Sequence, residues 1–585
     1  MNFSDPIPQS HCAFSNEGTL LAIAKAAELY VNILNFQFNS IQIFEAEKLT
    51  MRDKFVFKDV ITSIEWSPDD NFIMAILGKQ NQIHLRCLNP QVIEGYQEGW
   101  TGKIEEGMIG LAGQCWSPDS RQIISFSDLQ LRATVWSLVE QKAVAQIRNP
   151  KLLPPKGVCF TKNQKFMALA ERRETKDWIS IYYAGADWKL VNTFEVETFD
   201  LVDIMWCKED TALVVYDTPL EAKVLVYSAL TGDILARHQL HSPGLGVKSV
   251  SLSPSGIFMA VAYFDVKLRV FNAYSNKEIV ILDHVSQINL SAEEHTNVLV
   301  YREEQIRDRD SYNKEIYTFS YVNIQGNKEN QDQQIIKLPL LPKKEIQAYN
   351  ASTFEKVGLQ GPPTGVSLIQ WSFDSKYMAT KCDQVPNVVY IWDMQSVELH
   401  SVLVHLNPVK NFSFGPLTHQ LCIATSQSRF FTWNPFQAAV YELTSDQAGI
   451  TQQTNILAVN KIKWNPKGNK LILIDKGQAM IAFPGYEFSN FEQIQSQKQQ
   501  YSNHQSKDRA YNQDYNNLLQ SPAIMNSNYK QQQQNSANFN TNFNNGGNLR
   551  FSGQNVQNNG SYVTMSSGAN NGMAISSSYG FDMDN

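Results

Sequence analysis

The stretch Trp66-Ser67-Pro68-Asp69-Asp70 returns 50 residues later as Trp116-Ser117-Pro118-Asp119-Ser120. Looser copies keep an aromatic or apolar residue followed by polar turn residues, and they occupy residues 14–18, 160–163, 206–210, 252–256, 371–375 and 464–468. Their spacing is mostly 43 to 52 residues, which is the period of one blade of a β-propeller. The sequence therefore predicts an all-β repeat protein.

Local chemistry predicts a strand, a tight turn and a second strand in each copy. Pro68 and Pro118 preset φ for the turn, and the Asp, Asn or Gly residues that follow accept its dihedral angles. Residues 72–77 and 166–170, which follow two of these turns, are almost wholly apolar and are expected to be strands buried on both faces. A third strand ending on an aromatic residue is expected at residues 41–44, 133–136, 179–182, 224–227, 268–271 and 390–392.

The aromatic residues of the copies are predicted to be structural. Five tryptophans share the position before the turn, and Trp392, which is followed by Asp393, ends a third strand. We expect the five to be buried where strand meets turn: Trp66, Trp116, Trp206, Trp371 and Trp464. Trp100 lies outside this register, between Gly99 and Gly102, so its replacement is expected to cost little stability.

The number of units leaves the architecture open. Residues 412–418 form a ninth unit, and residues 297–301 with 316–319 suggest a tenth. A propeller usually has four to eight blades. About ten candidate units therefore predict two linked propellers, which we favour, or one enlarged ring, or units that are decorations. Any ring is expected to borrow a strand from one terminus.

Composition divides the chain into four parts. Propeller blades are expected in residues 1–302 and 364–485, separated by a charged and Gln-rich insertion or inter-blade loop at 303–363. Residues 486–585 are rich in Asn, Gln and Ser. Such a segment cannot bury enough apolar area to offset its ordering entropy, so it is predicted to be a disordered tail.

The overall composition indicates a soluble, cytoplasmic protein. Hydrophobic residues make up 43% of the chain, but the apolar runs are of strand length rather than membrane-span length. The N-terminal residues lack the features of a secretory signal. The seven cysteines are scattered, which is typical of a reducing compartment. A net charge of −7 argues against a role dominated by phosphate-backbone contacts, so neither a membrane nor a nucleic acid is an expected direct partner.

Catalytic and cofactor motifs are not found. The chain has no phosphate-binding loop, no zinc-protease motif, no nucleophile elbow and no dinucleotide fingerprint. Its histidines lack the cysteines or second cluster that a metal site needs. We therefore predict a protein that is not an enzyme and has no cofactor and no metal site.

The strongest surface candidate is a charged segment beside an aromatic residue. Residues 171–177 follow a buried strand and precede Trp178. They could be a solvated hairpin with weak ion pairs, or the polar rim of an interface anchored by Trp and Arg. On the second interpretation, changing both arginines to Glu is expected to weaken partner binding without affecting folding. The candidate partner-binding residues are Glu171, Arg172, Arg173, Lys176, Asp177 and Trp178, with Trp100 and Asp217 as secondary candidates.

Several runs that exceed a generic repeat consensus resemble a known family. They are residues 167–173 with Lys176-Asp177, residues 115–119 with 131–132 and 134–138, and Pro386-Asn387 before residues 391–393. These runs, with residues 1–4 and 103–107, resemble the WRAP-type WD-repeat proteins of centrosomes and spindle poles. The resemblance covers residues 1 to about 485 and leaves out the Asn/Gln-rich tail.

The resemblance implies a non-enzymatic scaffold that works with a coiled-coil partner of the SSX2-interacting-protein (Msd1-like) type. In that family the complex helps to anchor microtubule minus ends at spindle poles and supports centrosome, basal body and cilium assembly. The implied location is the cytoskeleton, at a centrosome, spindle pole or basal body. An alternative is an RNA- or ribosome-associated propeller of the translation-initiation-factor type, because such proteins also tolerate enlarged rings and irregular repeats.

Overall fold

The computed structural model describes residues 1–25, 39–78, 81–89, 100–106, 109–185, 187–240, 246–289, 298–307, 315–321, 335–338, 365–443, 457–484 and 562–566. The chain divides into two compact units, residues 1–483 with 561–585 and residues 484–560. All described strands belong to the first unit, which the following paragraphs concern.

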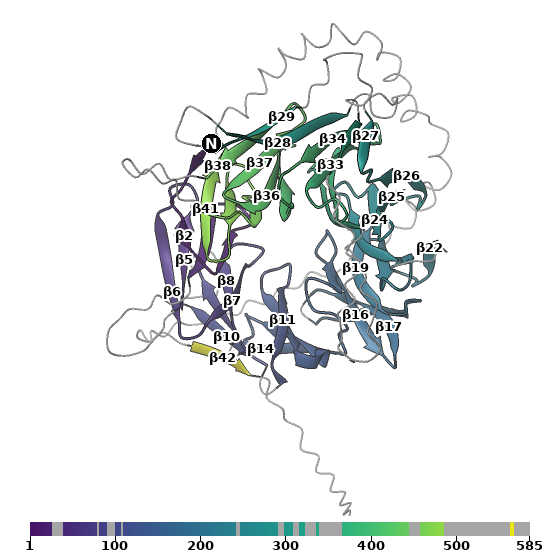
Figure 1. The fold of residues 1–585 in the computed structure, drawn as a ribbon. Helices are drawn as coiled ribbons and strands as arrows, with labels where there is room; N and C mark the ends of the chain where they lie inside the picture. Colours follow the sequence, from purple (N-terminus) through teal and green to yellow (C-terminus); the bar gives the residue numbers. More distant parts are fainter. Residues whose placement is uncertain are drawn as a thin grey trace, which may run out of the picture. The chain divides into compact units, whose positions relative to one another are not determined.

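The described strands form nine blades arranged in one ring (Figure 1). Each of the first six blades is an antiparallel sheet whose strands pair in chain order; blade 2 carries one further strand. Blades 1 to 3 are β3 (His11–Phe14), β4 (Leu20–Lys25), β5 (Asn39–Glu45), β6 (Met51–Phe57); β7 (Ile61–Trp66), β8 (Phe72–Leu77), β9 (Gln82–Cys87), β10 (Thr101–Glu105); and β11 (Leu111–Trp116), β12 (Gln122–Ser127), β13 (Arg132–Ser137), β14 (Lys142–Arg148). Blades 4 to 6 are β15 (Val158–Phe160), β16 (Phe166–Arg173), β17 (Lys176–Tyr183), β18 (Leu190–Glu195); β19 (Leu201–Cys207), β20 (Ala212–Asp217), β21 (Lys223–Ser228), β22 (Ile234–Gln239); and β23 (Val247–Leu252), β24 (Phe258–Tyr263), β25 (Lys267–Asn272), β26 (Glu278–Asp283). Blades 7 to 9 contain β31 (Val366–Trp371), β32 (Tyr377–Cys382), β33 (Val388–Asp393), β34 (Glu398–Val404); β35 (Asn411–Phe414), β36 (Leu421–Gln427), β37 (Arg429–Asn434), β38 (Gln437–Glu442); and β39 (Lys461–Trp464), β40 (Leu471–Ile474), β41 (Gln478–Phe483).

The ring closes with a strand from the N-terminus. Blade 9 has the order β1 (Asn2–Phe3), β41, β40, β39, and β2 (Ile7–Pro8) also pairs with β41. Each pair of neighbouring blades shares one apolar core, and the last of these cores joins Leu21 and Ile23 of blade 1 to Ile472 and Ile481 of blade 9. The expected terminal strand is confirmed. The preference for two propellers is wrong, because consecutive blades bury their faces against one another all the way round one enlarged ring.

The suspected tenth unit is a decoration of blade 7. It consists of β28 (Leu299–Arg307) and β29 (Glu315–Tyr321), which form a hairpin, and β28 pairs in parallel with β34 at the outer edge of the blade. The boundary that we placed after residue 302 falls inside β28. A separate two-stranded sheet joins β27 (Gln287–Asn289) to β30 (Ile335–Lys337). The rest of the predicted insertion lies largely outside the described residues.

One strand of the C-terminal tail is described. It is β42 (Tyr562–Ser566), which pairs in parallel with β10 at the edge of blade 2. The rest of the predicted tail lies outside the described residues, and the disorder of the tail stays a prediction.

The two faces of the ring differ in what they carry. Because the four strands of a blade are antiparallel, the Trp-Ser-Pro-Asp turns and the turns between third and fourth strands share one face, which we call the turn face. Hairpins between second and third strands and the connections between blades lie on the other, the hairpin face. A short 3-10 helix, η3 (Asp128–Gln130), connects the second and third strands of blade 3 and therefore lies on the hairpin face.

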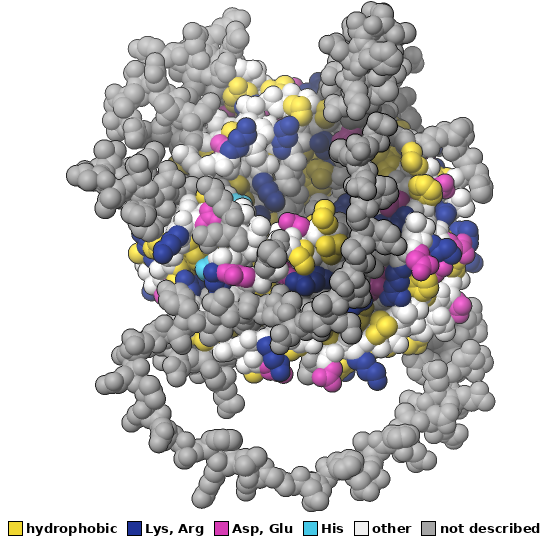
Figure 2. All heavy atoms as spheres, turned by 90° about the horizontal axis from the view of Figure 1, so that it is seen from below, with side chains coloured by type: hydrophobic (Ala, Val, Ile, Leu, Met, Phe, Trp, Pro, Cys, Tyr) yellow, Lys and Arg dark blue, Asp and Glu magenta, His cyan; other side chains and the backbone are white. Residues whose placement is uncertain are grey.

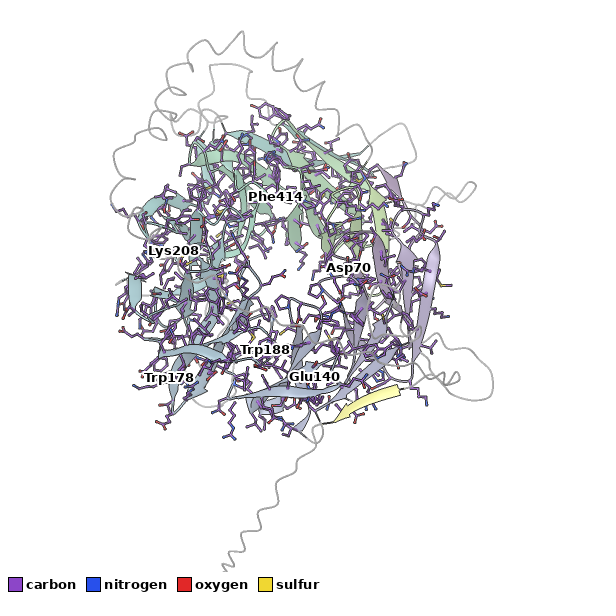
Figure 3. The ribbon with its side chains drawn as sticks, turned by 180° about the vertical axis from the view of Figure 1, so that it is seen from behind. Asp70, Glu140, Trp178, Trp188, Lys208 and Phe414 are labelled. Atoms are coloured by element: carbon purple, nitrogen blue, oxygen red, sulfur yellow. The ribbon has the colours of Figure 1, made fainter. Side chains whose placement is uncertain are left out.

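The repeated turn links neighbouring blades, as blades 2 and 5 show. Its fifth residue has positive φ, 57° at Asp70 and 67° at Asp210, a conformation that Asp tolerates better than most residues. The Asp70 carboxylate accepts hydrogen bonds from the backbone N–H groups of Asn16 (2.7 Å) and Glu17 (2.7 Å) in the turn of blade 1. Asp210 accepts the corresponding bonds from blade 4. Figure 3 places Asp70 beside the centre of the ring.

The repeat tryptophans also join neighbouring blades. Trp66 and Trp371 are 8% exposed, and their indole N–H groups donate to Ala13 O (3.1 Å) and Ser251 Oγ (3.1 Å) of the preceding blade. Trp116 is equally buried, but its N–H has no hydrogen-bond partner among the described residues. The tryptophans of blades 5 and 9 are only partly buried and make the same type of bond: Trp206 to Cys159 O and Trp464 to Ser413 O. Burial of the repeat aromatics is thus confirmed most fully in blades 2, 3 and 7.

Trp392 and Trp100, which lie outside the position shared by the five repeat tryptophans, also belong to the core. Trp392 is 4% exposed and donates its indole N–H to Thr380 Oγ1 (2.9 Å). Trp100 is 9% exposed, and its ring centroid lies 5.8 Å from that of Phe72. The expectation that Trp100 contributes little to stability is therefore wrong, because a residue outside the repeat register fills the core between blades 2 and 3.

Candidate partner-binding surface

The charged segment that the sequence singled out is a two-residue hairpin on the hairpin face of blade 4. It joins β16 to β17, with Arg173 opposite Lys176. Glu174 and Thr175 have φ of 47° and 72°, as the favoured two-residue hairpin turn requires. Figure 3 places Trp178, which follows in β17, at the outer edge of the ring.

The first carboxylate of this hairpin is buried and fully engaged. Glu171 is 2% exposed and accepts hydrogen bonds from Tyr182 Oη (2.8 Å) and Arg173 Nε (2.9 Å). Burial, reinforced by the charge of Glu171, raises the pKa of Tyr182. The Arg173 guanidinium also lies 5.2 Å from the centroid of the Trp178 ring, within cation–π range.

The second carboxylate fixes the connection between blades 4 and 5. Asp177 is 1% exposed and accepts hydrogen bonds from Lys151 Nζ (2.8 Å), Arg172 Nη1 (2.6 Å) and Leu201 N (2.8 Å). Burial alone raises the pKa of this carboxyl group, but these hydrogen bonds outweigh burial and place the pKa below its ordinary value. Thr198 Oγ1 donates a further bond at 2.9 Å.

These contacts correct one expectation. Arg172 and Arg173 are each 38% exposed, and each holds a buried carboxylate. Changing both to Glu would leave two buried carboxylates without these partners and beside new negative charges, which is strongly destabilising. The double Glu variant is therefore not expected to leave folding intact.

The remaining sequence candidates occupy three different settings. Lys176 forms an exposed ion pair with Glu195 at 2.7 Å. Asp217 is fully buried and accepts backbone N–H bonds from Phe199 (2.7 Å) and Asp200 (2.9 Å), so it anchors the same connection as Asp177. Trp100 precedes the fourth strand of blade 2, towards the turn face, and is not brought near the hairpin.

A hollow of about 490 Å³ opens beside the hairpin. It lies between η3 of blade 3, the connection into blade 4 and the start of β19. The Lys151 side chain is 9% exposed and pairs with both Asp177 and Asp200, whereas Lys156 is exposed and has no ion pair among the described residues. The lining residues are Gln130, Lys151, Leu152, Lys156, Arg172, Asp200, Leu201 and Val202.

Exposed apolar side chains lie in the loops that carry this hollow. Leu129 in η3 is 88% exposed and has φ of 59°, an uncommon backbone conformation for a bulky residue. Phe199, next to Asp200, is 69% exposed, and Leu220 in the adjacent hairpin of blade 5 is 73% exposed. We call these three residues, the hollow and the hairpin the blade 3–5 surface. It combines unpaired positive charge with apolar contact area, which suits protein recognition.

Sequence reasoning did not find Leu129, Phe199 or Lys156. Phe199 is a single aromatic residue between polar residues, which was a usable signal. Leu129 and Lys156 gave no usable sequence signal, because their exposure depends on the turns that carry them.

The outer edge of the ring differs from this surface. In Figure 2, Lys and Arg side chains are interspersed with Asp and Glu rather than gathered in a patch of one sign. Ion pairs on outer strands, such as Lys103 with Glu105 and Lys176 with Glu195, agree with this mixture. The described residues contain no helix long and apolar enough to cross a membrane and no cluster of potential metal ligands.

Comparison with known proteins gives relatives over most of the chain. No family model matches. Mouse WD repeat-containing protein WRAP73 is 31% identical over 509 residues, which is 83% of this chain and 96% of the mouse protein. An uncharacterised WD repeat-containing protein of Schizosaccharomyces pombe is 23% identical over 349 residues, 58% of this chain and 62% of that protein. Among solved structures, the C-terminal WD40 domain of Sif2 has a TM-score of 0.41 at 12% identity and covers 73% of this chain and 97% of that domain.

The ring of four-stranded blades with its repeated turns and tryptophans defines a WD-repeat β-propeller, a class of protein-interaction scaffold. Sequence identity with WRAP73 over 83% of the chain assigns the protein to a family within this class. The chain belongs to the WRAP-type family of WD-repeat proteins, and the resemblance seen in its sequence is confirmed.

Proposed function

We propose that this protein is a non-enzymatic scaffold of microtubule-organising centres. In this role it captures a coiled-coil protein of the SSX2-interacting-protein (Msd1-like) type, helps to anchor microtubule minus ends at spindle poles and supports centrosome, basal body and cilium assembly. Its expected location is the cytoskeleton, at a centrosome, spindle pole or basal body. The observation that carries the proposal is the similarity to WRAP73 over 83% of the chain, because the resemblance to the WRAP-type family implies this role.

The blade 3–5 surface is the proposed contact with the coiled coil. A coiled-coil helix presents apolar side chains flanked by charged ones. Leu129 and Phe199 offer apolar contacts, and Lys156 offers a positive charge in the hollow between them. Arg172 adds one partly exposed guanidinium group whose geometry suits carboxylates.

The decisive variant removes the apolar contacts without disturbing buried charges. In Leu129→Ala/Phe199→Ala, each lost side chain is expected to remove about 1 to 3 kcal/mol of contact energy, so partner affinity falls at least about tenfold. The matched control is Leu230→Ala/Phe436→Ala on the turn face, where the side chains are 81% and 69% exposed. Affinity is measured by titrating the full-length protein with the coiled-coil partner. Equal affinity in the two variants would exclude this surface as the contact.

A pull-down distinguishes the scaffold from the ribosome-associated alternative. Spindle-pole and coiled-coil proteins recovered with the wild type, and lost with the Leu129/Phe199 variant, support the proposal. Ribosomal proteins in a nuclease-sensitive complex would replace it. A fluorescent fusion that fails to concentrate at a spindle pole, centrosome or basal body would also count against the proposed role.

A further inference from the structure

A second group of charges lies on the hairpin face, at the inner strands of blades 6 to 9. Lys248 is the second residue of β23, Lys381 the fifth of β32, and Lys410 immediately precedes β35. Lys461 and Lys463 are the first and third residues of β39. We call these five residues the lysine arc. The inner strands of blades 2 to 5 have no lysine at the corresponding ends.

Hydrogen bonds link the strands that carry four of the lysines, and Lys248 joins them through its ion pair with Asp383, two residues from Lys381. Lys381 Nζ donates to Val409 O (2.8 Å), next to Lys410. Asn411, which follows Lys410, accepts the backbone N–H of Ile462 (3.1 Å), next to Lys461. Lys463 Nζ donates to Cys12 O in blade 1 (3.1 Å). The arc is therefore continuous across the joined inner strands.

The positive charges of the arc are only partly balanced. Asp383 pairs with Lys248. Asp475, in the hairpin of blade 9, accepts hydrogen bonds from Asn460 Nδ2 (2.7 Å) and from backbone N–H groups. Lys410 and Lys461 are exposed and have no ion pair among the described residues. Among the described residues, five ammonium groups thus lie beside the carboxylates of Asp383 and Asp475, in a chain whose net charge is −7.

The lysines also destabilise one another's charged state. Burial lowers the pKa of Lys381, and Lys410 and Lys248 add to this effect while Asp383 opposes it. Burial likewise lowers the pKa of Lys463, and Lys461 adds to the lowering, although Cys12 opposes it. A bound anion would relieve this repulsion.

Unpartnered polar atoms accompany the lysines. Ser249 Oγ, Ser367 Oγ and His11 Nδ1 are buried and have no hydrogen-bond partner among the described residues. Ser249 follows Lys248, and Ser367 lies in a β-bulge of β31 opposite Lys381 and Cys382. Buried polar atoms are rarely left unsatisfied. Because these atoms are buried, they make the environment of the lysines polar, whereas the ammonium groups themselves would contact a bound anion.

We propose that the lysine arc binds an acidic peptide segment, with consecutive Asp or Glu carboxylates lying along the inner strands of blades 6 to 9. Binding to single-stranded nucleic acid combines positive charge with aromatic rings on which bases stack. The exposed aromatic side chains of the described residues lie on other parts of the ring: Tyr183, Phe199, Tyr274, Tyr321, Phe373 and Phe436. The arc offers five point charges and one partly buried aromatic ring, Phe264, whose centroid lies 5.3 Å from Lys248 Nζ. This composition suits carboxylates better than a row of stacked bases. This site is separate from the blade 3–5 surface and does not depend on the proposed coiled-coil contact.

The test uses the full-length protein and a fluorescent oligoglutamate peptide of about eight residues, which spans roughly 26 Å when extended. The variant Lys410→Glu/Lys461→Glu changes only exposed lysines without ion pairs, so the fold is retained. The matched control, Lys162→Glu/Lys467→Glu, makes the same charge change on the turn face, also at exposed lysines. Fluorescence anisotropy measures the affinity, and circular dichroism checks the fold.

We expect the arc variant to lose at least about tenfold in affinity and the control to lose less than about threefold. Wild-type affinity should also fall as ionic strength rises from about 0.1 M to about 1 M, because the screening length shortens from about 10 Å to about 3 Å. Equal losses in the two variants would mean that net charge alone attracts the peptide, which overturns the proposal. Tighter binding of a single-stranded RNA of equal charge, lost in the arc variant, would also overturn it in favour of a nucleic-acid site.

Discussion

Removal of Arg429 should release the hairpin that decorates blade 7. Arg429 Nε donates to Glu303 Oε1 at 2.6 Å, and the two side chains are 7% and 0% exposed. The Arg429 guanidinium lies 3.7 Å from the centroid of the Tyr317 ring in β29, and Glu303 Oε2 accepts the backbone N–H of Leu406 (2.8 Å). One buried arginine thus ties β28 and β29 to blade 8.

The size of the effect follows from this burial. Arg429→Met leaves the carboxylate of Glu303 buried with one backbone donor, which costs about 3 to 5 kcal/mol. The double variant Glu303→Leu/Arg429→Met replaces both charges by apolar groups. It leaves only the Leu406 N–H unsatisfied, at a cost of about 1 to 3 kcal/mol. The double variant should therefore be more stable than the single one by about 2 kcal/mol.

Urea unfolding of the full-length protein measures these differences, and hydrogen exchange at β28 and β29 shows whether the hairpin opens first. The matched control is Lys176→Met, which breaks the exposed ion pair with Glu195 and should cost at most about 1 kcal/mol. The reasoning fails if Arg429→Met costs no more than this control, or if the double variant is the least stable of the three.

Three further predictions concern other parts of the ring. Trp100→Ala and Trp116→Ala should each lower the free energy of unfolding by about 3 to 5 kcal/mol, because both rings lie in the core. If urea unfolding showed only a small loss of stability for Trp100→Ala, the shared core would be contradicted. Asp70→Ala should cost about 2 kcal/mol or more through two lost charge-assisted bonds to blade 1, whereas Asp70→Asn keeps an acceptor and should cost less in the same assay. Burial lowers the pKa of His284 to about 4 and, with the charge of Arg429, that of His405 to about 3. The unfolded chain takes up these protons near pH 6.5. The contribution of the two neutral histidines to stability is therefore complete above about pH 6.5 and is lost as the pH falls towards 4 and 3. His284→Gln should flatten the dependence of melting temperature on pH in that range, and an unchanged slope would refute the burial of His284 in its neutral form.

The repeat was readable from sequence because its chemistry is local. Pro68, the positive-φ position of Asp70 and the run of apolar residues that became β8 all act within a dozen residues. They predicted turn, burial and strand order correctly. The number of blades in one ring could not be read from any single repeat. It depends on how cores between blades close on one another, and nothing in a single unit records whether the ninth core meets the first blade.

At the candidate site, too, the sequence revealed local chemistry but not the contacts between distant segments. Glu171 and Asp177 were recognised as unusual, but the Asp177 partners Lys151, Thr198 and Leu201 come from the segments on either side of the blade. The charged hairpin is therefore largely a structural network, and the exposed groups beside it, Leu129 and Phe199, come from other loops. Trp100 misled for a related reason, since its burial depends on Phe72 and not on the repeat register.

Closure of blade 9 by β1 sets an order of events during synthesis. The backbone N–H of Ser4 bonds Ile481 O (2.8 Å), and Ile481 N bonds Ser4 Oγ across 477 residues. Closing a loop of that length costs about 5 kcal/mol in chain entropy. Blades 2 to 8 share cores only with the blades that precede and follow them in the chain and can pack as they leave the ribosome, but strand β1 and one face of blade 1 must wait for blade 9. A chain that stops before β41 would be left as an open crescent with the apolar faces of its first and last blades uncovered, a substrate for chaperones and proteases rather than a smaller working protein.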